Sequence, residues 1–231
     1  MNPDDPNVLL IEAISRALDH LNERVVYLGG CVVGLMITDP ARPPVRATVD
    51  VDVIVEVVSH ADYYALADDL RGVGFAEDPE SGVLCRWRLG SLKLDVVPTD
   101  GTILGFSSTW LQPAVDNAER VVLPSERSIR VVTAPFLLAT KLEAFYDRGN
   151  DDFLASHDLE DIINLIDGRA ELPTEVSAST PELREYLREE FEGLLADERF
   201  TQALPGHLGR AAADQARLEM LIERLRRIAG L

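Results

Sequence analysis

Hydrophobic residues recur every third or fourth position near the start of the chain. Leu10, Ala13, Ile14 and Leu21 belong to this series. Such spacing places one apolar stripe along a helix, so it predicts an amphipathic helix from about Pro6 to Asn22 that packs on a core.

The next apolar run, Val25–Leu28, is short and predicts a buried strand. It ends at Gly29-Gly30, and the apolar stretch 31–37 then predicts a buried helix. Three prolines lie between Asp39 and Pro44. Because proline removes a backbone donor and fixes φ, this segment is expected to be a loop.

The stretch Thr48–Val55 is rich in β-branched residues and alternates, which predicts a strand. Side chains along a strand point to opposite faces with a period of two. Asp50 and Asp52 are therefore expected side by side on one face, and valines occupy the other.

The same reading of the chain up to residue 132 predicts one more helix, a hairpin, a loop and two further strands. The helix covers 61–72, the hairpin strands 83–89 and 92–97 flank Gly90-Ser91, the loop covers 100–108, and the last strands cover 120–123 and 129–132.

The pattern becomes helical after residue 133. We therefore expect an α+β protein: a mixed-sheet α/β core over 1–133 and a helical C-terminal domain over 134–231. Proline at the first turn and glycine after the last support individual helices. The predicted helices cover 134–147, 157–167, 181–195 and 207–228.

Composition narrows the classes of function. The 231 residues carry a net charge of −18, and an acidic surface repels phosphate backbones, which argues against nonspecific nucleic-acid binding. Cys31 and Cys85 match no metal-binding spacing and are expected to be free buried thiols in a reducing compartment. The first residues lack a secretory pattern and no apolar run reaches membrane-spanning length, so we expect a cytoplasmic protein without a membrane partner.

The candidate chemistry centres on carboxylates. Two aspartates on one strand face repel, so either one stays protonated or a cation lies between them. Carboxylate oxygens suit Mg²⁺, which also accepts substrate phosphates. Asp95, on the second hairpin strand, is a third candidate if it lies beside Asp50 and Asp52. The alternative is a strand with one solvated face.

Gly29-Gly30 offers a second candidate feature. A strand, two glycines and a helix start allow the backbone to approach phosphates closely, with free N–H groups at the helix N-terminus. A simple tight turn is the alternative.

Together these motifs resemble the nucleotidyltransferase fold of the DNA polymerase β superfamily. Two helical stretches narrow the resemblance to the AbiEii/AbiGii toxin-type nucleotidyltransferases, including the mycobacterial tRNA-modifying toxins. The resemblance covers roughly residues 20 to 170. The residues that carry it are Gly29-Gly30, Thr48-x-Asp50-x-Asp52, Lys93-Leu-Asp95-Val-Val, Ala139–Phe145 with Arg148-Gly149, and Ser156–Ile162.

The resemblance implies roles for the sheet residues. Asp50 and Asp52 would bind two Mg²⁺ ions with the triphosphate, and Asp95 would hold the metal near the attacking hydroxyl and help to deprotonate it. Gly29, Gly30 and Cys31 would line the phosphates. Cys31 departs from the family, which commonly has Ser or Thr there, and a thiol is the weaker hydrogen-bonding group.

The resemblance also assigns two helical residues. Lys141 would contact the triphosphate and Asp158 would lie near the nucleotide or Lys141. Structural alternatives stay open for both: Lys141 could snorkel at the edge of a core face, and Asp158 could be an ordinary acid at a helix N-terminus. Arg148 is expected to pair with Asp151 or Asp152.

Other residues favour structural interpretations. Arg86 and Arg88 share a hairpin face, either as a solvated edge or as a basic patch for an acceptor. We expect Trp87 and Trp110 in the core, His157 at the surface, and a packing helix with a solvated basic face over 217–227.

The function implied is a Mg²⁺-dependent nucleotidyltransferase of the EC 2.7.7 type that moves a nucleoside monophosphate from an NTP to an acceptor hydroxyl. The resemblance suggests a tRNA 3′ end or a protein as acceptor, a role as the toxin of a toxin–antitoxin or phage-defence system, and a cognate antitoxin as partner. The alternatives are a small-molecule, antibiotic-type nucleotidyltransferase and a non-catalytic nucleotide-binding or interaction protein with the same fold.

Overall fold

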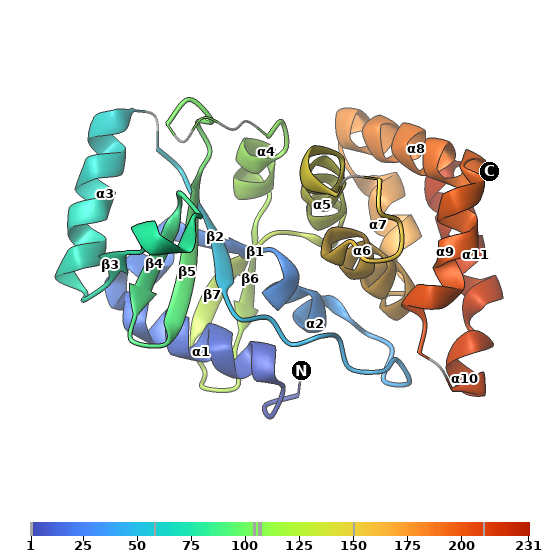
Figure 1. Ribbon diagram of the computed structural model, residues 1–231, viewed down its shortest axis with the longest axis horizontal. Helices are drawn as coiled ribbons and strands as arrows, with labels where there is room; N and C mark the ends of the chain where they lie inside the picture. Colours follow the sequence, from blue (N-terminus) through green and yellow to red (C-terminus); the bar gives the residue numbers. More distant parts are fainter. Residues whose placement is uncertain (1, 58, 104, 106–107, 150, 210) are drawn as a thin grey trace. The chain divides into compact units, whose positions relative to one another are not determined.

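The computed structural model describes residues 2–57, 59–103, 105, 108–149, 151–209 and 211–231 (Figure 1). Its backbone contacts divide the chain into two units. One, which we call the sheet unit, comprises residues 1–35 and 46–133, and the other, the helical unit, comprises 36–45 and 134–231. That separate folding domains meet near residue 133 stays a prediction.

The sheet unit is built on a seven-stranded mixed sheet in the order β3-β4-β5-β2-β1-β7-β6. The β2–β5 and β1–β7 pairs are parallel and the other neighbours are antiparallel. Apolar side chains of β1, β2 and β5 form its core. The strands are β1 (Val25–Leu28), β2 (Val51–Val55), β3 (Ala76–Glu77), β4 (Arg86–Leu89), β5 (Leu92–Pro98), β6 (Glu119–Val122) and β7 (Ser128–Val131).

The helices of this unit cover and connect the strands. α1 packs against β2 and β5, and a side chain of its N-cap Asp5 accepts from two backbone N–H groups of the first turn. The helices are α1 (Pro6–Leu18), α2 (Val33–Met36, whose last residue enters the helical unit), α3 (His60–Gly72) and α4 (Leu111–Asp116), with 3₁₀ turns at Asp19–Arg24, Gly30–Val32 and Pro79–Ser81.

The helical unit contains seven helices among the residues described. They are α5 (Ala134–Arg148), α6 (His157–Gly168), α7 (Leu172–Ala178), α8 (Pro181–Ala196), α9 (Glu198–His207), α10 (Ala212–Gln215) and α11 (Leu218–Ala229). None of the helices in the described ranges is long and apolar enough to cross a bilayer.

The loop that crosses into the helical unit is tied to the C-terminal end of α6. The backbone N–H groups of Thr38 and Asp39 both donate to the Gly168 carbonyl, each at 3.0 Å. The fully buried Asp167 pairs with Arg42 at 2.5 Å and with Arg217 at 2.8 Å. These contacts explain why a segment from the first fifth of the sequence belongs to the helical unit.

The α+β class is confirmed, with a mixed sheet followed by helices. The hairpin turn at Gly90-Ser91, the proline loop and the buried tryptophans are also confirmed, as are the two buried free cysteines. His157 is exposed, as expected.

Several boundaries were wrong for local reasons. Asp50 precedes β2, which begins at Val51, the first residue of the segment that pairs with β5. Residues 83–85 form a turn after the left-handed Gly82 rather than a strand. The single helix predicted over 207–228 is instead two helices, α10 and α11, because the chain is extended at Leu208, directly after the end of α9. The sequence patterns did not predict β3, α4, α7 or α9.

The solvated basic face predicted for 217–227 was also partly wrong. Arg217 is mostly buried against Asp39 and Asp167. Arg224 is buried, and it donates to the carbonyls of Ile166 and Asp167 at the C-terminal end of α6. An arginine in this position satisfies helix carbonyls that have no partner within the helix.

Candidate active site

A row of paired residues crosses the sheet unit and gathers the candidate carboxylates. Leu28 of β1 pairs with Asp52 of β2, Asp52 with Asp95 of β5, and Asp95 with Arg86 of β4. Directly paired residues project from the same sheet face. Asp52 and Asp95 are therefore neighbours on one face, which is the condition under which Asp95 is a candidate site residue. Arg86 lies on the same face beside Asp95.

The Arg86 guanidinium binds two of the three carboxylates. Its Nε lies 2.7 Å from Oδ1 of Asp95 and its Nη2 lies 2.7 Å from Oδ2 of the same residue. The same Nη2 lies 2.5 Å from Oδ2 of Asp50. Arg86 thus makes a bidentate contact with one aspartate and bridges it to another, which is the strong geometry for arginine and carboxylate.

Burial makes this bridge more than a surface ion pair. The side chain of Arg86 is 13% exposed and that of Asp95 is 9% exposed, while Asp50 retains 27%. The hydrogen bond to Asp95 raises the pKa of Arg86 above its ordinary value, despite the opposing effect of burial. Arg86 is therefore cationic, and its assignment to a solvated edge was wrong.

The segment before β2 holds Asp50 through a buried asparagine of α1. The Asn7 side chain donates to the Arg46 carbonyl at 3.0 Å and accepts from the Thr48 N–H at 2.8 Å. The Thr48 hydroxyl donates to the Asp50 carbonyl at 3.2 Å. Asn7 thereby holds the backbone segment that positions Asp50 beside Arg86.

Asp52 packs on Gly29. Gly29 has φ +80° and ψ −164°, a conformation available essentially to glycine alone. A Cβ atom there would overlap the Asp52 carboxylate. The glycine is therefore needed both for the turn after β1 and for the position of Asp52.

Gly30 and Cys31 are buried in the 3₁₀ turn that follows Gly29. The Cys31 thiol donates to the Leu28 carbonyl at 3.2 Å, so its hydrogen points to the backbone of β1. A phosphate contact by Gly29, Gly30 or Cys31 stays a prediction.

The aspartate row also affects Cys85. Burial raises the pKa of this thiol to about 12, with a further contribution from the charges of Asp95 and Asp52. Cys85 is therefore neutral at physiological pH and is a packing residue.

The oxygen atoms of Asp50 and Asp95 suit a cation at one point. Both Oδ2 atoms converge on the single Nη2 of Arg86, and carboxylate oxygens are the donors that Mg²⁺ prefers. Within the described ranges, no group of three or more His, Cys, Asp or Glu residues is arranged to hold a metal ion. The fit is thus to one cation between Asp50 and Asp95, with Asp52 adjacent in the row.

The helical unit contains the other predicted site residues in a separate cluster. Lys141 of α5 is buried and its Nζ lies 2.9 Å from Oδ1 of Asp158 and 2.8 Å from Oδ2 of Asp161, both on α6. Arg148 contacts Asp158 through Nε at 2.8 Å and Nη2 at 3.0 Å. The partner the structure gives for Arg148 is thus Asp158, and a pairing with Asp151 or Asp152 stays a prediction.

The contacts in this cluster favour the charged forms of Lys141 and Asp158. Burial alone would lower the pKa of Lys141, but Asp161 and Asp158 outweigh it and raise the pKa. Burial opposes ionisation of Asp158, yet the hydrogen bond from Arg148 and the charge of Lys141 lower its pKa to about 2. The structure therefore brings Lys141 and Asp158 together as predicted, and their contact with a nucleotide stays a prediction.

Two residues of these clusters, Arg86 and Asp161, were not among the predicted site residues. The two-residue turn at Gly90-Ser91 fixes the hairpin register and already places Arg86 opposite Asp95. Asp161 lies three residues after Asp158 on one helix, so it faces the same neighbour. Both signals were present in the sequence.

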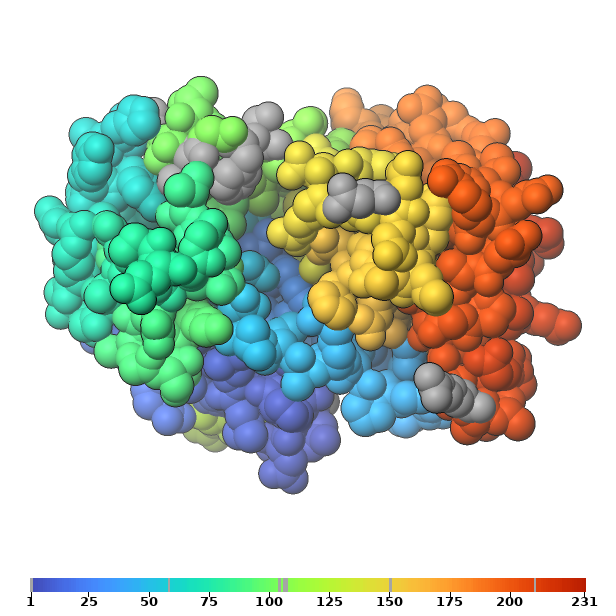
Figure 2. Space-filling model, in the orientation of Figure 1, coloured from blue at the N-terminus to red at the C-terminus, as the bar shows by residue number. Residues whose placement is uncertain are grey.

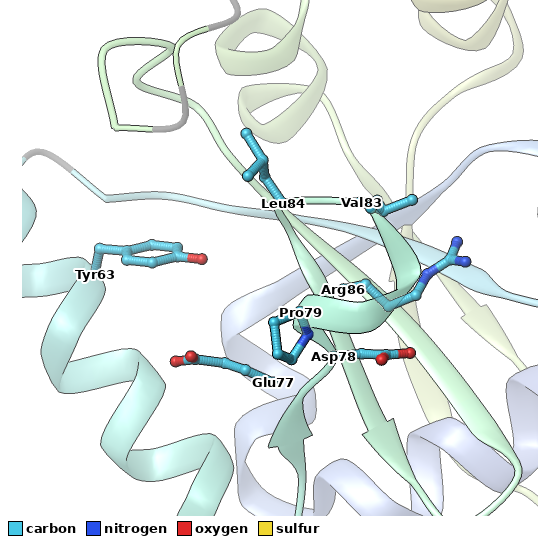
Figure 3. A pocket seen from close by; sticks show the side chains of 8 residues that line it. Tyr63, Glu77, Asp78, Pro79, Val83, Leu84 and Arg86 are labelled. Carbon is cyan, nitrogen blue, oxygen red and sulfur yellow. The ribbon is translucent and has the colours of Figure 1, made fainter.

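Two cavities adjoin the row on the hairpin side. The first, of about 320 Å³, is lined by Tyr63, Glu77, Asp78, Pro79, Gly82, Val83, Leu84 and Arg86. In Figure 3, Arg86 and Asp78 lie on one side of this cavity and Tyr63 and Glu77 on the other. The second cavity, of about 430 Å³, shares Asp78 and Arg86 and adds Glu80, Ser81, Arg88 and Lys93.

The space-filling view shows the hairpin and its neighbouring loop at the surface of the sheet unit (Figure 2). Arg88 and Lys93 pair across the hairpin, and the Arg88 side chain is half exposed. The row of carboxylates is thus next to surface cavities rather than enclosed in the core.

Comparisons with known proteins give similarities of fold. No protein-family model matches the chain, and no curated protein does. A nucleotidyltransferase-like antigenic protein from Paracoccidioides brasiliensis is 20% identical, with 88% of this chain and 94% of that chain covered and a TM-score of 0.48.

Two further solved structures are similar to a comparable degree. The antibiotic-resistance factor ANT(2'')-Ia is 14% identical, with 81% of this chain and 94% of that chain covered and a TM-score of 0.48. JHP933 from Helicobacter pylori is 13% identical, with 96% and 92% covered and a TM-score of 0.47. At these identities and TM-scores, no activity or residue role follows for this chain.

Proposed function

We propose that this protein is a nucleotidyltransferase that moves a nucleoside monophosphate from an NTP to an acceptor hydroxyl. The observation that carries the proposal is that Asp50 and Asp95 converge on one cationic group, the guanidinium of Arg86, with Asp52 beside Asp95 on the same sheet face. Clustered carboxylates of this kind are costly in a protein unless a cation is part of their function.

In the proposed reaction the acceptor oxygen attacks the α-phosphorus of the NTP. A new oxygen–phosphorus bond forms, the bond from the α-phosphorus to the bridging oxygen breaks, and pyrophosphate leaves. Asp95, the more buried of the two carboxylates that contact Arg86, accepts the hydroxyl proton. Asp52 would add negative charge beside the cation position between Asp50 and Asp95, and Gly29 lets the Asp52 carboxylate approach the turn after β1.

Mg²⁺ is the proposed cation. When bound, it would polarise the phosphate oxygens and favour ionisation of the acceptor hydroxyl. Asp50 and Asp95 are the residues that would hold it, and a second ion with Asp52 is part of the proposal from the motif resemblance.

The finer parts of the proposal rest on that resemblance. They are membership in the AbiEii/AbiGii toxin-type family, a tRNA 3′ end or a protein as acceptor, a cognate antitoxin, a cytoplasmic location, and triphosphate contacts from Lys141. Asp158 would act through its pairing with Lys141.

One observation favours the rival function, a non-catalytic nucleotide-binding or interaction protein. Arg86 already supplies a positive charge between two of the carboxylates, and a permanent arginine there would take the place of a metal. A test must therefore distinguish a catalytic metal site from carboxylates that are paired permanently with Arg86.

The test is transfer of label from each α-labelled NTP, with Mg²⁺, into total tRNA, total protein and a small-molecule pool. Wild-type protein should label one pool, and Asp52→Ala or Asp95→Asn should abolish the labelling. Asp68→Asn is the matched control, because Asp68 is an exposed aspartate of α3 that pairs only locally with Arg71 among the contacts described. Equal labelling by wild type and Asp95→Asn would refute the proposed site.

A further inference from the structure

We propose that Arg86 is an internal counter-ion that occupies the cation position between Asp50 and Asp95 and is displaced when a divalent metal binds. This inference rests on the proposed function only in taking a divalent cation as a ligand of the row. It assigns Arg86 a positioning role, because Arg86 orders the carboxylates without being a group that reacts.

The first step is steric. One atom, Nη2 of Arg86, lies 2.5 Å from Asp50 Oδ2 and 2.7 Å from Asp95 Oδ2. Mg²⁺ binds carboxylate oxygens at about 2.0–2.1 Å. A metal bound to the same two oxygens on the side where Nη2 now lies would overlap Nη2, so guanidinium and metal cannot occupy that position together.

The second step is electrostatic. Asp50, Asp52 and Asp95 bring three like charges to one region of the sheet face, and two of them are tied directly to Arg86. Without a cation these carboxylates repel each other. Arg86 supplies one positive charge to the metal-free protein, and a divalent ion would supply two, so exchange is electrostatically favourable once metal is present.

The third step is that a displaced Arg86 has a place to go. Its side chain borders both cavities, and Asp78 borders both as well. The Asp78 N–H donates to the Arg86 carbonyl at 2.9 Å, so the two residues are neighbours. The ion pair between Asp78 and Arg88 is long, with 3.7 Å between Oδ2 and Nε. Figure 3 shows the Asp78 carboxylate on the same side of the cavity as Arg86.

The consequence is that metal binds in competition with the protein's own arginine. The free protein keeps its carboxylates in order at low metal concentration, and metal affinity is lower than three adjacent aspartates would otherwise give. A ligand that brings its own cation, such as a metal–triphosphate complex, is then favoured over the bare ion because it adds contacts of its own.

The experiment compares Mn²⁺ binding to wild-type protein and to Arg86→Gln, by calorimetry and by the loss of free Mn²⁺ signal in electron paramagnetic resonance. We expect Mn²⁺ to bind Arg86→Gln at least tenfold more tightly. Arg120→Gln is the matched control: it removes an arginine of β6 that pairs with the exposed Glu23, at the opposite edge of the sheet from the hairpin, and its Mn²⁺ affinity should equal that of wild type.

A stability measurement accompanies the titration. Without metal, Arg86→Gln should melt at a lower temperature than wild type because the carboxylates repel, and Mn²⁺ should raise its melting temperature by more than it raises that of wild type. Should Arg86→Gln fail to fold, the Arg86 Nε–H resonance of wild-type protein serves instead, and it should move on Mg²⁺ titration while that of Arg120, which pairs with Glu23, stays in place.

Equal Mn²⁺ affinity in wild type and Arg86→Gln would overturn the proposal, as would an Arg86 resonance that is unmoved at saturating metal. Absence of Mn²⁺ binding in Arg86→Gln would also overturn it, because the aspartates would then not bind a metal even when Arg86 is removed. Failure of the proposed function is seen separately: tighter Mn²⁺ binding by Arg86→Gln in a protein that labels no acceptor would refute transfer alone.

Discussion

Gly29 and Asp52 lie in direct contact, so that a single added methyl group on the glycine would overlap the aspartate carboxylate. The contact joins the turn after β1 to the strand that carries the aspartate, and it places backbone rather than a side chain beside a charged group. Gly29 is thus required by conformation and by space together.

Gly29→Ala should therefore damage both stability and the site. The backbone conformation of Gly29 costs a non-glycine residue on the order of 1–3 kcal/mol, and the new methyl group displaces Asp52. We expect a lower free energy of unfolding in urea and weaker Mn²⁺ binding. Gly72→Ala is the control, since a Cβ at Gly72 meets no atom within 4 Å; equal losses in both variants would contradict the role given to Gly29.

Asn7→Ala should loosen the backbone segment that positions Asp50. Asn7 is buried and its side chain holds the backbone of Arg46 and Thr48 by two hydrogen bonds. Unsatisfied buried partners cost about 1–3 kcal/mol, and the released segment leaves Asp50 less ordered. Urea unfolding and Mn²⁺ titration measure the two effects.

Asn117→Ala is the control for Asn7. Its side chain makes one local bond, to the Pro113 carbonyl at 2.9 Å, and is exposed. A loss of stability in Asn7→Ala with unchanged Mn²⁺ affinity would show that Asn7 acts on folding only.

Lys141→Met should destabilise the helical unit strongly. The change leaves Asp161 and Asp158 buried without the cation that lies between them, and breaking a buried pair in this way costs about 3–5 kcal/mol. Thermal and urea unfolding measure the loss. The chain has one other lysine, Lys93, so Lys93→Met is the control and should have a small effect.

The same variant tests the nucleotide role proposed for Lys141. The double variant Lys141→Met/Asp161→Asn removes one of the stranded charges and should recover part of the stability. If the recovered protein also keeps its wild-type KM for NTP, Lys141 is a structural residue and its proposed triphosphate contact is wrong.

The pairing of Asp158 predicts a loss of stability in acid. Its pKa is about 2 in the folded protein against an ordinary 3.8, so the unfolded chain takes up the proton first. The contribution, on the order of 2 kcal/mol, is present above about pH 4 and is lost as the pH falls through 2. Unfolding in urea from pH 5 to pH 2 measures it.

Arg148→Gln supplies the comparison for this pH effect. Arg148 lowers the pKa of Asp158 by hydrogen bonding, so the variant should lose less stability between pH 4 and pH 2 than wild type loses. Parallel stability curves for the two proteins would show that Arg148, whose side chain is 67% exposed, adds nothing measurable.

Local sequence patterns accounted for much of the sheet unit. Alternation marked β5 and the core of β2, the Gly-Gly pair marked the turn after β1, and the two-residue hairpin turn contained the register that places Arg86 opposite Asp95. Patterns failed where helix breaks depend on single residues, as at Leu208, and where strand ends depend on which neighbour is present, as at Asp50.

By itself the sequence determined most of the elements, the α+β class, the Asp-x-Asp motif and the glycine turn, because these follow from periodicity and from the conformational limits of particular residues. Only the tertiary structure decided which distant residues meet. The parallel pairing of β2 with β5 placed Asp52 beside Asp95, Asn7 was set against Thr48, and residues 36–45 were joined to α6. Such contacts depend on burial and hydrogen-bond satisfaction summed over the whole fold, and no local period encodes them.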